Sequence, residues 1–381
     1  MARAAVPAYV GQDFSACPPG HRFNLYFRVW TDQWKKEETS TAALRDVLCL
    51  PANARALLDA LIERQLQMAQ AIPAEQLCVI DAQATSPFAT GLGLEHPIEN
   101  GFAFLAPYGL PYLAGSAVKG VLRRAAEELC ADGEPDFDPA LIDALFGPED
   151  TLAARRGTLT CWDVLPQFDA MTLDIMTPHQ SGYYQGNESP HDAGKPTPIP
   201  FLALPAGAKF RFVLRFEPSL VPAASRAALA DWQAVALRIA RHAFDWLGFG
   251  AKTAVGYGAM ALDRQAAAQR AAEVESVRRK RAEQAKRAAR VAEIDAMEPV
   301  QRELEQFFDQ RLDKNQGKRS VYFNALKKGE FSGEVKRAAA ERVRRLMQAE
   351  KCWKEQSTKK NPDKDHDYQD TLLVKKWLSE S

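Results

Sequence analysis

The sequence of 381 residues lacks three features that would have assigned it to a class of protein. Its net charge is zero, because 49 Lys and Arg balance 49 Asp and Glu, so any nucleic-acid surface depends on where the cations are placed. No apolar run is long enough to cross a bilayer, and the first residues lack the apolar stretch of a secretory signal. We therefore expect a cytoplasmic protein with no membrane partner.

Cysteines are few and lie far apart in the chain. None of the six belongs to a Cys-x-x-Cys pair, which makes a zinc knuckle or a redox dithiol unexpected. A chain of this length also needs no disulfide framework to hold its core together. We predict reduced thiols and neither a metal nor a cofactor. The six positions are Cys17, Cys49, Cys78, Cys130, Cys161 and Cys352.

The composition that is present divides the chain into three segments. Residues 1–75 form a helical N-terminal accessory segment, with an amphipathic helix predicted over residues 53–66. Residues 76–262 are rich in glycine, proline and aromatic residues and mix strand-like with helix-like patterns. Residues 263–381 form a charged helical extension that begins with a long solvated helix, in which residues 278–281 are the densest basic run.

The middle segment carries the clearest patterns of secondary structure. Residues 209–216 alternate apolar and polar side chains as a half-buried strand does, and residues 157–164 form a second strand. Apolar residues at helical spacing predict helices over residues 116–130 and 227–247. Strands and helices interleaved in this way favour an α+β fold. The aromatic residues that we assign to its core are Phe210, Phe212, Trp232 and Trp246.

A doubled glycine motif, GFGAKTAVGYG, spans residues 248–258 and follows the second helix. Glycines permit positive φ and leave backbone amides uncovered, so phosphates of a ligand can approach the main chain. Lys252 adds a cation, Thr253 a hydroxyl, and Tyr257 a ring that can stack on a base. The alternative is a tight turn in which the glycines serve packing only. The glycines of this loop are Gly248, Gly250, Gly256 and Gly258.

A second motif, GLPYLAGSAVKGVLR, spans residues 109–123 and begins the first helix. Ser116 is the predicted N-cap of that helix, and a helix N-terminus favours phosphate. Lys119 and Arg123 are four residues apart and therefore share one face, where they extend the phosphate site by one turn. The alternative is a solvated basic stripe on an amphipathic helix. We predict that this helix start and the glycine loop face a common groove.

These motifs resemble the RAMP superfamily of CRISPR systems, and within it the subunits of type III-B Cmr effector complexes. Residues 248–258 are similar to its glycine-rich loop and residues 109–123 to its Pro-Gly-Ser-Ser-x-Lys-Gly signature, in which Ala114 and Ala117 replace Pro and Ser. The resemblance covers about residues 80–262. The other matching pieces are residues 91–101, 145–147, 174–179 with Tyr183 and Tyr184, and 198–201.

The resemblance implies a ferredoxin-like (RRM-type) core in a multisubunit ribonucleoprotein. A subunit of this kind holds the CRISPR RNA near its 3′ end and caps the filament of backbone subunits. RNA of variable sequence is held through backbone and 2′-OH contacts, while base pairing selects the target. The implied partners are CRISPR RNA, target RNA, the backbone RAMP subunit, the small helical subunit and a second RAMP subunit at the 3′ end.

The candidate acid–base residues of the middle segment are His96, His179, His191 and His242, and His179 is the most suggestive of them. His179, near Asp174 and the Tyr183-Tyr184 pair, has a side chain suited to acid–base cleavage at a 2′-OH. No paired carboxylates accompany it, so we predict an RNA-contacting residue in a subunit that is not an enzyme. Two alternatives remain open at this point. One is a standalone RAMP endoribonuclease that processes precursor CRISPR RNA, and the other is a scaffold that docks through the extension after Asp263.

Overall fold

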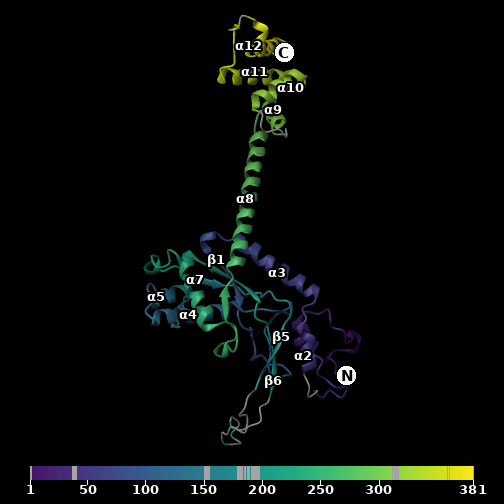
Figure 1. The fold of residues 1–381 in the computed structure, drawn as a ribbon, viewed down its shortest axis with the longest axis vertical. Helices are drawn as coiled ribbons and strands as arrows, with labels where there is room; N and C mark the ends of the chain where they lie inside the picture. Colours follow the sequence, from purple (N-terminus) through teal and green to yellow (C-terminus); the bar gives the residue numbers. More distant parts are fainter. Residues whose placement is uncertain are drawn as a thin grey trace. The chain divides into compact units, whose positions relative to one another are not determined.

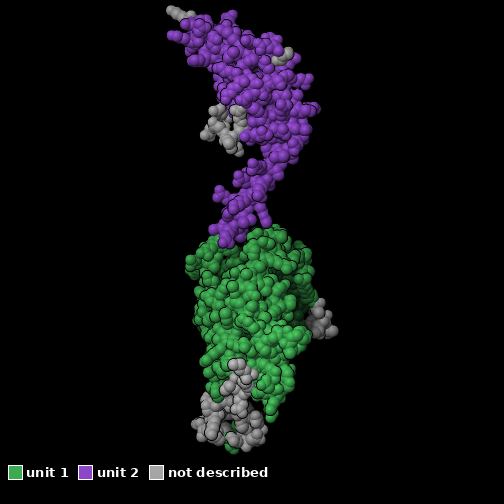
Figure 2. Space-filling view, turned by 90° about the vertical axis from the view of Figure 1, so that its right-hand side faces the viewer, with its two compact units in different colours: residues 1–270 green, residues 271–381 purple. Residues whose placement is uncertain are grey.

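The computed structural model divides the chain into two compact units, Met1–Arg270 and Ala271–Ser381 (Figures 1 and 2). Three segments are predicted from the sequence, but residues 1–75 lie in the same unit as the middle segment. The structure describes residues 2–36, 41–149, 155–177, 183, 186, 189, 198–310, 317–357, 359 and 361–380.

A four-stranded antiparallel sheet forms the centre of the first unit, with strand order β4-β7-β1-β8. Along the chain its elements follow the order β1-α4-β4-β7-α7-β8. Two hairpins, β2-β3 and β5-β6, are inserted between them. The mixed helix and sheet class predicted from the sequence is confirmed. The strands are β1 (Leu77–Ala84), β2 (Phe104–Leu105), β3 (Leu110–Pro111), β4 (Leu159–Cys161), β5 (Thr172–Met176), β6 (Ile199–Ala203), β7 (Lys209–Phe216) and β8 (Met260–Leu262).

The helices of this unit start and stop where proline, aspartate or glycine residues favour it. Pro51 precedes α3, Asp138 caps α5 by accepting from the Leu141 amide, and Asp231 caps α7 in the same way. The predicted helix over residues 116–130 is confirmed as α4. The helices are α1 (Pro19–Asn24), α2 (Thr41–Leu48), α3 (Ala52–Gln70), α4 (Gly115–Ala131), α5 (Pro139–Phe146) and α7 (Trp232–His242), which continues as the π-helical turn η6 (Ala243–Leu247).

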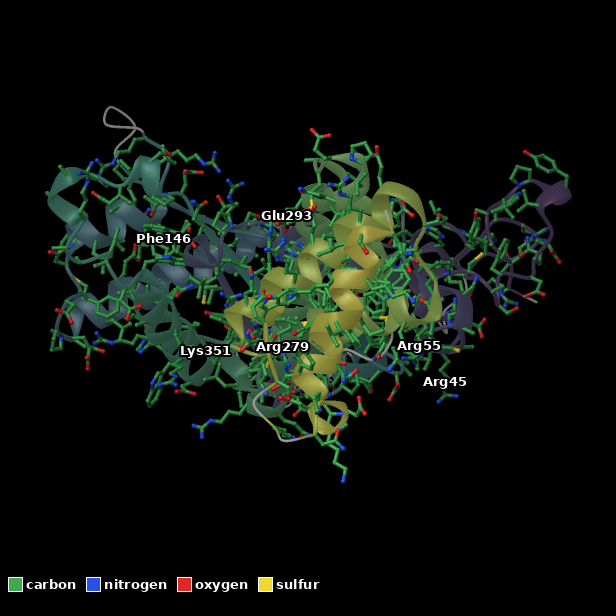
Figure 3. All side chains as sticks on the ribbon, turned by 90° about the horizontal axis from the view of Figure 1, so that it is seen from above. Arg45, Arg55, Phe146, Arg279, Glu293 and Lys351 are labelled. Carbon is green, nitrogen blue, oxygen red and sulfur yellow. The ribbon has the colours of Figure 1, made fainter. Side chains whose placement is uncertain are left out.

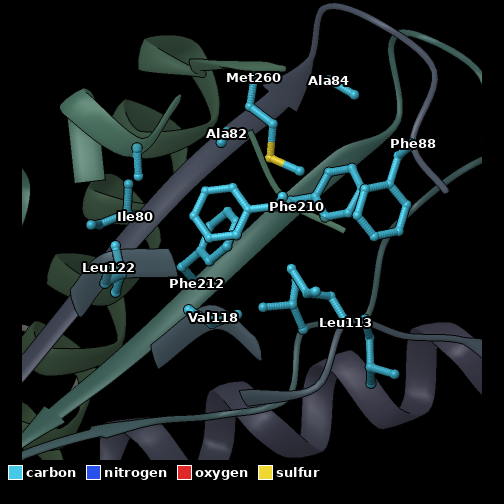
Figure 4. Close-up of a cluster of buried hydrophobic side chains, with 14 of the residues drawn as sticks. Ile80, Ala82, Ala84, Phe88, Leu113, Val118, Leu122, Phe210, Phe212 and Met260 are labelled. Carbon is cyan, nitrogen blue, oxygen red and sulfur yellow. The ribbon is translucent and has the colours of Figure 1, made fainter. Parts of the chain in front are cut away.

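The alternating aromatic side chains of β7 build the core beneath α4 and α7 (Figure 4). Phe216 stacks on Trp232 with ring centroids 4.8 Å apart, and Phe212 lies 5.0 Å from Phe249. Burying each such ring stabilises the fold by roughly 2–3 kcal/mol. The assignment of Trp246 to this core is wrong, since 78% of its surface is exposed. The π-helical turn departs from 3.6-residue spacing and rotates Trp246 away from the core.

The side of the sheet that faces away from α4 and α7 is covered by α3. Ile62 and Leu66 of α3 line the same small cavity as Arg211 and Val213 of β7. Gln65 donates a hydrogen bond of 2.9 Å to the Asp163 carbonyl, which ties α3 to the chain after β4. An RRM that binds RNA on its sheet stacks bases on an open face. Here the N-terminal helix occupies that face.

A buried carboxylate on β1 holds the start of α8 (Arg264–Asp295). Asp81 is 5% exposed and accepts hydrogen bonds from Arg211 at 2.6 Å and Arg270 at 2.8 Å. The Asp263 amide also donates to the Asp81 carbonyl. The sheet thus fixes where the long helix begins.

The second unit has a separate, all-helical core. Tyr322, Val343 and Met347 are each no more than 1% exposed there. The long solvated helix predicted after Asp263 is confirmed as α8, in which only Ile294 is buried. No described helix is both long and apolar enough to span a membrane. The helices after α8 are α9 (Pro299–Asp309), α10 (Lys318–Lys328), α11 (Gly333–Ala349) and α12 (His366–Ser379).

Candidate nucleic-acid interface

The glycine loop between η6 and β8 needs its glycines for close packing. A Cβ on Gly250 would lie 2.2 Å from the Ala89 carbonyl oxygen, and a Cβ on Gly258 would lie 1.9 Å from the Phe249 carbonyl oxygen. Both have positive φ, 92° and 69°. A side chain at either position is therefore excluded by contact as well as by backbone conformation. Gly256 differs, since its φ is 93° but nothing lies within 4 Å of its Cβ position.

The prediction that this loop exposes uncovered amides is wrong for most of its length. The Gly258 amide donates to the Pro87 carbonyl at 2.8 Å, the Ala251 amide to Ala89 at 2.7 Å and the Phe249 amide to Gly258 at 2.9 Å. The first two bonds fasten the loop to the segment after β1. Fewer backbone amides therefore remain free to bind a phosphate than the sequence predicts. The amides of Gly248, Val255, Gly256 and Tyr257 also donate to carbonyls.

The side chains of the loop lie against the β5-β6 hairpin. The Lys252 ammonium lies 5.6 Å from the centre of the Phe201 ring, and the Tyr257 ring is 5.7 Å from the same ring. The Tyr257 hydroxyl donates to the Asp174 carboxylate. Burial, followed by that hydrogen bond, raises the pKa of Tyr257 to about 12. Tyr257 and Asp174 are 83 residues apart, so local sequence patterns could not pair them.

Two apolar side chains beside the loop are open to solvent. Trp246 is 78% exposed and Val255 is 69% exposed. Neither was predicted as a contact residue, because Trp246 fits the apolar stripe of a helix and Val255 carries no signal in the sequence. An exposed indole is suited to stacking on a base.

The start of α4 differs from the prediction. Ala114, and not Ser116, occupies the N-cap, and Ser116 is exposed. The Gly115 amide donates to the Asp163 carboxylate at 2.7 Å. A Cβ on Gly115 would lie 2.3 Å from the Cys161 carbonyl oxygen, so the first residue of the helix packs directly against β4. The N-cap thus lies two residues before the predicted one. A carboxylate therefore takes the place that a phosphate was expected to occupy.

Lys119 and Arg123 have different surroundings along α4. Lys119 is half-buried, and burial, together with the nearby Arg156 and Arg123, lowers its pKa. Arg123 pairs with Glu127 at 2.9 Å and Glu149 at 3.4 Å and donates to the Gly147 carbonyl. Arg123 is therefore neutralised within the chain, which leaves Lys119 as the cation of this pair that an anion would stabilise.

The two predicted halves of the groove contact different strands of the sheet. Lys119 lies near Cys161, at the end of β4, whereas the loop contacts Pro87, Ala89 and the β5-β6 hairpin and continues into β8. β4 and β8 are opposite edges of the sheet. The common groove stays a prediction, and its two sides meet different edge strands.

Two of the four candidate histidines, His96 and His242, lie in the part of the chain that the structure describes. His179, His191 and Tyr184 lie outside the described residues. His242 contacts Glu128 at 2.9 Å, and His96 stacks on Phe23 at 3.7 Å, so each has a partner that orients it within the fold. Among the described residues, no group of three or more His, Cys, Asp or Glu side chains could hold a metal ion.

Comparison with known proteins shows which family the segment with both motifs matches. Residues 81–261 match the RAMP superfamily. This segment is a RAMP superfamily domain. The RAMP domain begins at Asp81 and ends in β8, so it includes the central sheet apart from the first residues of β1 and the last residue of β8. The resemblance predicted from the glycine loop and the residues 109–123 is confirmed.

Among curated proteins, the chain is similar to the CRISPR system Cmr subunit Cmr6 of Pyrococcus furiosus. The two are 28% identical over a match that covers 45% of this chain and 64% of the relative. The match thus spans less than two thirds of that relative's length. The pieces of sequence outside the two motifs, residues 91–101, 145–147, 174–179 and 198–201, resemble this sixth Cmr subunit in particular, in agreement with the similarity.

Two solved structures are also similar to the chain. One is a chain of a type III-B Cmr-beta complex bound to cognate target RNA, with 19% identity, a TM-score of 0.40 and coverage of 58% of this chain and 69% of that chain. The other is Cmr6 from Pyrococcus furiosus, with 24% identity, a TM-score of 0.30 and coverage of 49% and 97%.

Proposed function

We propose that this chain is an RNA-binding, non-catalytic subunit of a type III-B CRISPR (Cmr) effector complex. It holds the CRISPR RNA near its 3′ end and caps the filament of backbone RAMP subunits. The observation that carries the proposal is the RAMP domain at residues 81–261, together with the similarity to a Cmr6 subunit. The cytoplasmic location and the partner subunits belong to the same proposal.

The topology supports a ferredoxin-like (RRM-type) core. The order β-α-β-β-α-β along the chain and the antiparallel sheet order β4-β7-β1-β8 are those of this fold. Because α3 faces the outer side of the sheet, the RNA is held at the loops and edges of the domain instead. Backbone contacts of this kind suit a guide whose sequence varies.

The side chains of the glycine loop supply the RNA contact. Lys252, held at positive φ and beside Phe201, provides a fixed cation, and Thr253 provides a hydroxyl. The exposed Trp246 adds a surface on which a base stacks. Lys119 provides a second, half-buried cation, and an anion beside it relieves the cost of keeping that ammonium charged.

The test is retention of CRISPR RNA by the assembled complex. We expect Lys119→Gln with Lys252→Gln to release RNA from this subunit and to lower the slope of log affinity against log salt by about 1.4, since each lost contact with a single strand changes it by about 0.7. The matched control is Arg226→Gln with Arg241→Gln, which removes two exposed cations that have no ion pair among the described residues.

Equal loss in both double variants, or no loss in either, would contradict the proposed site. Cleavage of repeat RNA by the purified chain without metal, lost in His179→Ala, would favour the endoribonuclease instead. Assembly that survives removal of RNA but fails when residues 263–381 are deleted would favour the scaffold. The last two outcomes would each assign a different function to the chain, an endoribonuclease or a scaffold.

A further inference from the structure

The zero net charge of the chain is the sum of two units with opposite net charges. Residues 1–270 carry 23 Lys and Arg against 29 Asp and Glu, whereas residues 271–381 carry 26 against 20. The second unit is therefore basic and the unit with the RAMP domain is acidic. Residues 278–290 alone contain seven Lys and Arg and one Glu, a net charge of +6 that equals the excess of the whole second unit. This segment lies within α8.

Six of these cations are exposed and have no ion pair among the described residues. Arg290, the seventh, differs, since it pairs with Glu293, Glu305 and Asp309 and so belongs to the core of the second unit. The six others lie within ten residues of continuous helix, or about 14 Å. We call them the basic segment of α8: Arg278, Arg279, Lys280, Arg281, Lys286 and Arg287, of which Arg279 is labelled in Figure 3.

The basic segment has no apolar face on which a protein helix or a membrane would pack. The exposed valines of α8 are Val274 and Val291, which lie on either side of the segment and not within it. A coiled-coil partner requires apolar residues every three to four positions, and a membrane-surface helix requires a wide apolar face. What the segment offers is positive charge around a solvated helix. Its fitting partner is therefore a polyanion whose charges repeat at short intervals.

We propose that the basic segment of α8 binds the phosphate backbone of a nucleic acid, as a second contact outside the RAMP domain. The contact reads no sequence, because flexible Lys and Arg side chains on an exposed helix meet phosphates and not base edges. It rests on the proposed function only for the statement that this nucleic acid is the CRISPR RNA or its target.

The test uses the full chain and a single-stranded RNA of 30 nucleotides with arbitrary sequence. Arg278→Gln, Arg279→Gln, Lys280→Gln and Arg281→Gln are combined, since glutamine is a good helix former and keeps α8 intact. We expect affinity at low salt to fall at least about tenfold and the salt slope to fall by about 1.4 to 2.8, for two to four lost phosphate contacts. A single-stranded DNA of the same length distinguishes RNA from a generic phosphate backbone.

The matched control removes four exposed cations from other helices of the second unit. Lys327→Gln, Lys328→Gln, Arg345→Gln and Lys364→Gln change the net charge by the same amount. If this control weakens binding as much as the α8 variant, overall charge is responsible and the proposal is wrong. An unchanged affinity in the α8 variant, or equally effective competition by polyglutamate at the same charge concentration, also overturns it.

The outcome is separable from that of the proposed function. Loss of RNA in the α8 variant with full retention in Lys119→Gln/Lys252→Gln supports the α8 contact and contradicts the RAMP-domain site. The reverse pattern contradicts the α8 contact alone. Circular dichroism of each variant confirms that the helix content is unchanged.

Discussion

The two units of this chain are stabilised internally by different sets of interactions. The first unit packs aromatic rings under a sheet and brings backbone against backbone at glycines, as at Gly258. The second unit has a small helical core with a buried ion cluster, in which Glu305, 7% exposed, accepts from Lys318 at 2.7 Å and also pairs with Arg290. Both units thus bury a carboxylate among cations, as at Asp81 and Glu305, but the first unit depends in addition on close backbone packing at its glycines.

This difference follows from composition. Large aromatic and β-branched residues fill a sheet core without polar help, whereas the second unit, rich in Ala, Glu, Lys and Arg, buries less apolar surface per residue. A carboxylate placed among cations from neighbouring helices then fixes how those helices pack. Glu305 on α9 meets Arg290 on α8, Lys318 on α10 and Arg342 on α11. The following substitutions test whether each unit fails for its own reason.

The largest effect is expected at Gly258. Gly258→Ala places a Cβ 1.9 Å from the Phe249 carbonyl oxygen at a positive φ, and we expect a loss of about 3 kcal/mol or more in the first unit. Gly256→Ala is the control, since its Cβ meets nothing within 4 Å and the cost is that of the backbone conformation, about 1 kcal/mol. Hydrogen exchange resolved by peptide should become faster in residues 1–270 and stay unchanged in α10 and α11. Equal effects of both variants would contradict the packing role.

A slightly smaller loss is expected from Asp81→Asn. Two arginines, Arg211 and Arg270, lose their shared carboxylate while staying partly buried, at a cost of about 3 kcal/mol. Asp169→Asn is the control, because its pair with Arg55 is exposed and contributes about 0.5 kcal/mol or less. Urea denaturation followed by tryptophan fluorescence measures the difference. A change of similar size in both variants would show that the burial of Asp81 has no energetic consequence.

Glu305→Gln tests the ion cluster of the second unit. We expect a loss of about 2 kcal/mol confined to α8–α12, since three cations lose one carboxylate. Burial pushes the pKa of Glu305 up, but Lys318 and Arg290 outweigh it, so the pKa is lowered on folding. The resulting stability is present above the ordinary glutamate pKa of about 4.3 and is lost as the pH falls through the lower folded value.

The pH dependence of the stability of the second unit provides a control for the Glu305→Gln prediction. Glu305→Gln should remove the acid-induced loss in the second unit, while Glu341→Gln, which breaks an exposed pair with Arg337 at 3.7 Å, should leave it in place. Acid titration of amide exchange in α10 and α11 measures both. Acid sensitivity that persists unchanged in Glu305→Gln would assign it to other carboxylates.

The smallest effect is expected from Tyr257→Phe. The hydrogen bond to Asp174 contributes about 1 kcal/mol to holding the loop on the β5-β6 hairpin. The pKa of Tyr257 is raised from 10 to about 12, so this contribution is complete below pH 10 and is lost as the pH rises through about 12. The protection factors of the loop amides between pH 9 and 12, which correct for the base-catalysed intrinsic rate, should lose their pH dependence in the variant. A dependence unchanged from the parent chain would show that the contact does not hold the loop.

Sequence patterns predicted the regular elements better than the site. Period-two alternation located β7, helical spacing located α3 and α4, and both depend on neighbours in the chain. The predicted cap at Ser116 is wrong because the Gly115 amide finds the Asp163 carboxylate 48 residues away. The partners of Arg123 include the Gly147 carbonyl, and no spacing rule in the helix itself indicates it.

The sequence by itself indicated a RAMP domain in the middle segment, the α+β class of that segment and the presence of a long basic helix, because each depends on local motifs or on composition. Only the tertiary structure decided which of these groups remain available to a ligand. Hydrogen bonds between segments far apart in the chain use the loop amides and Arg123, and they leave Lys252, Trp246 and the cations of α8 exposed or half-exposed. Whether a polar group is satisfied depends on what folding brings beside it, and that information is not local.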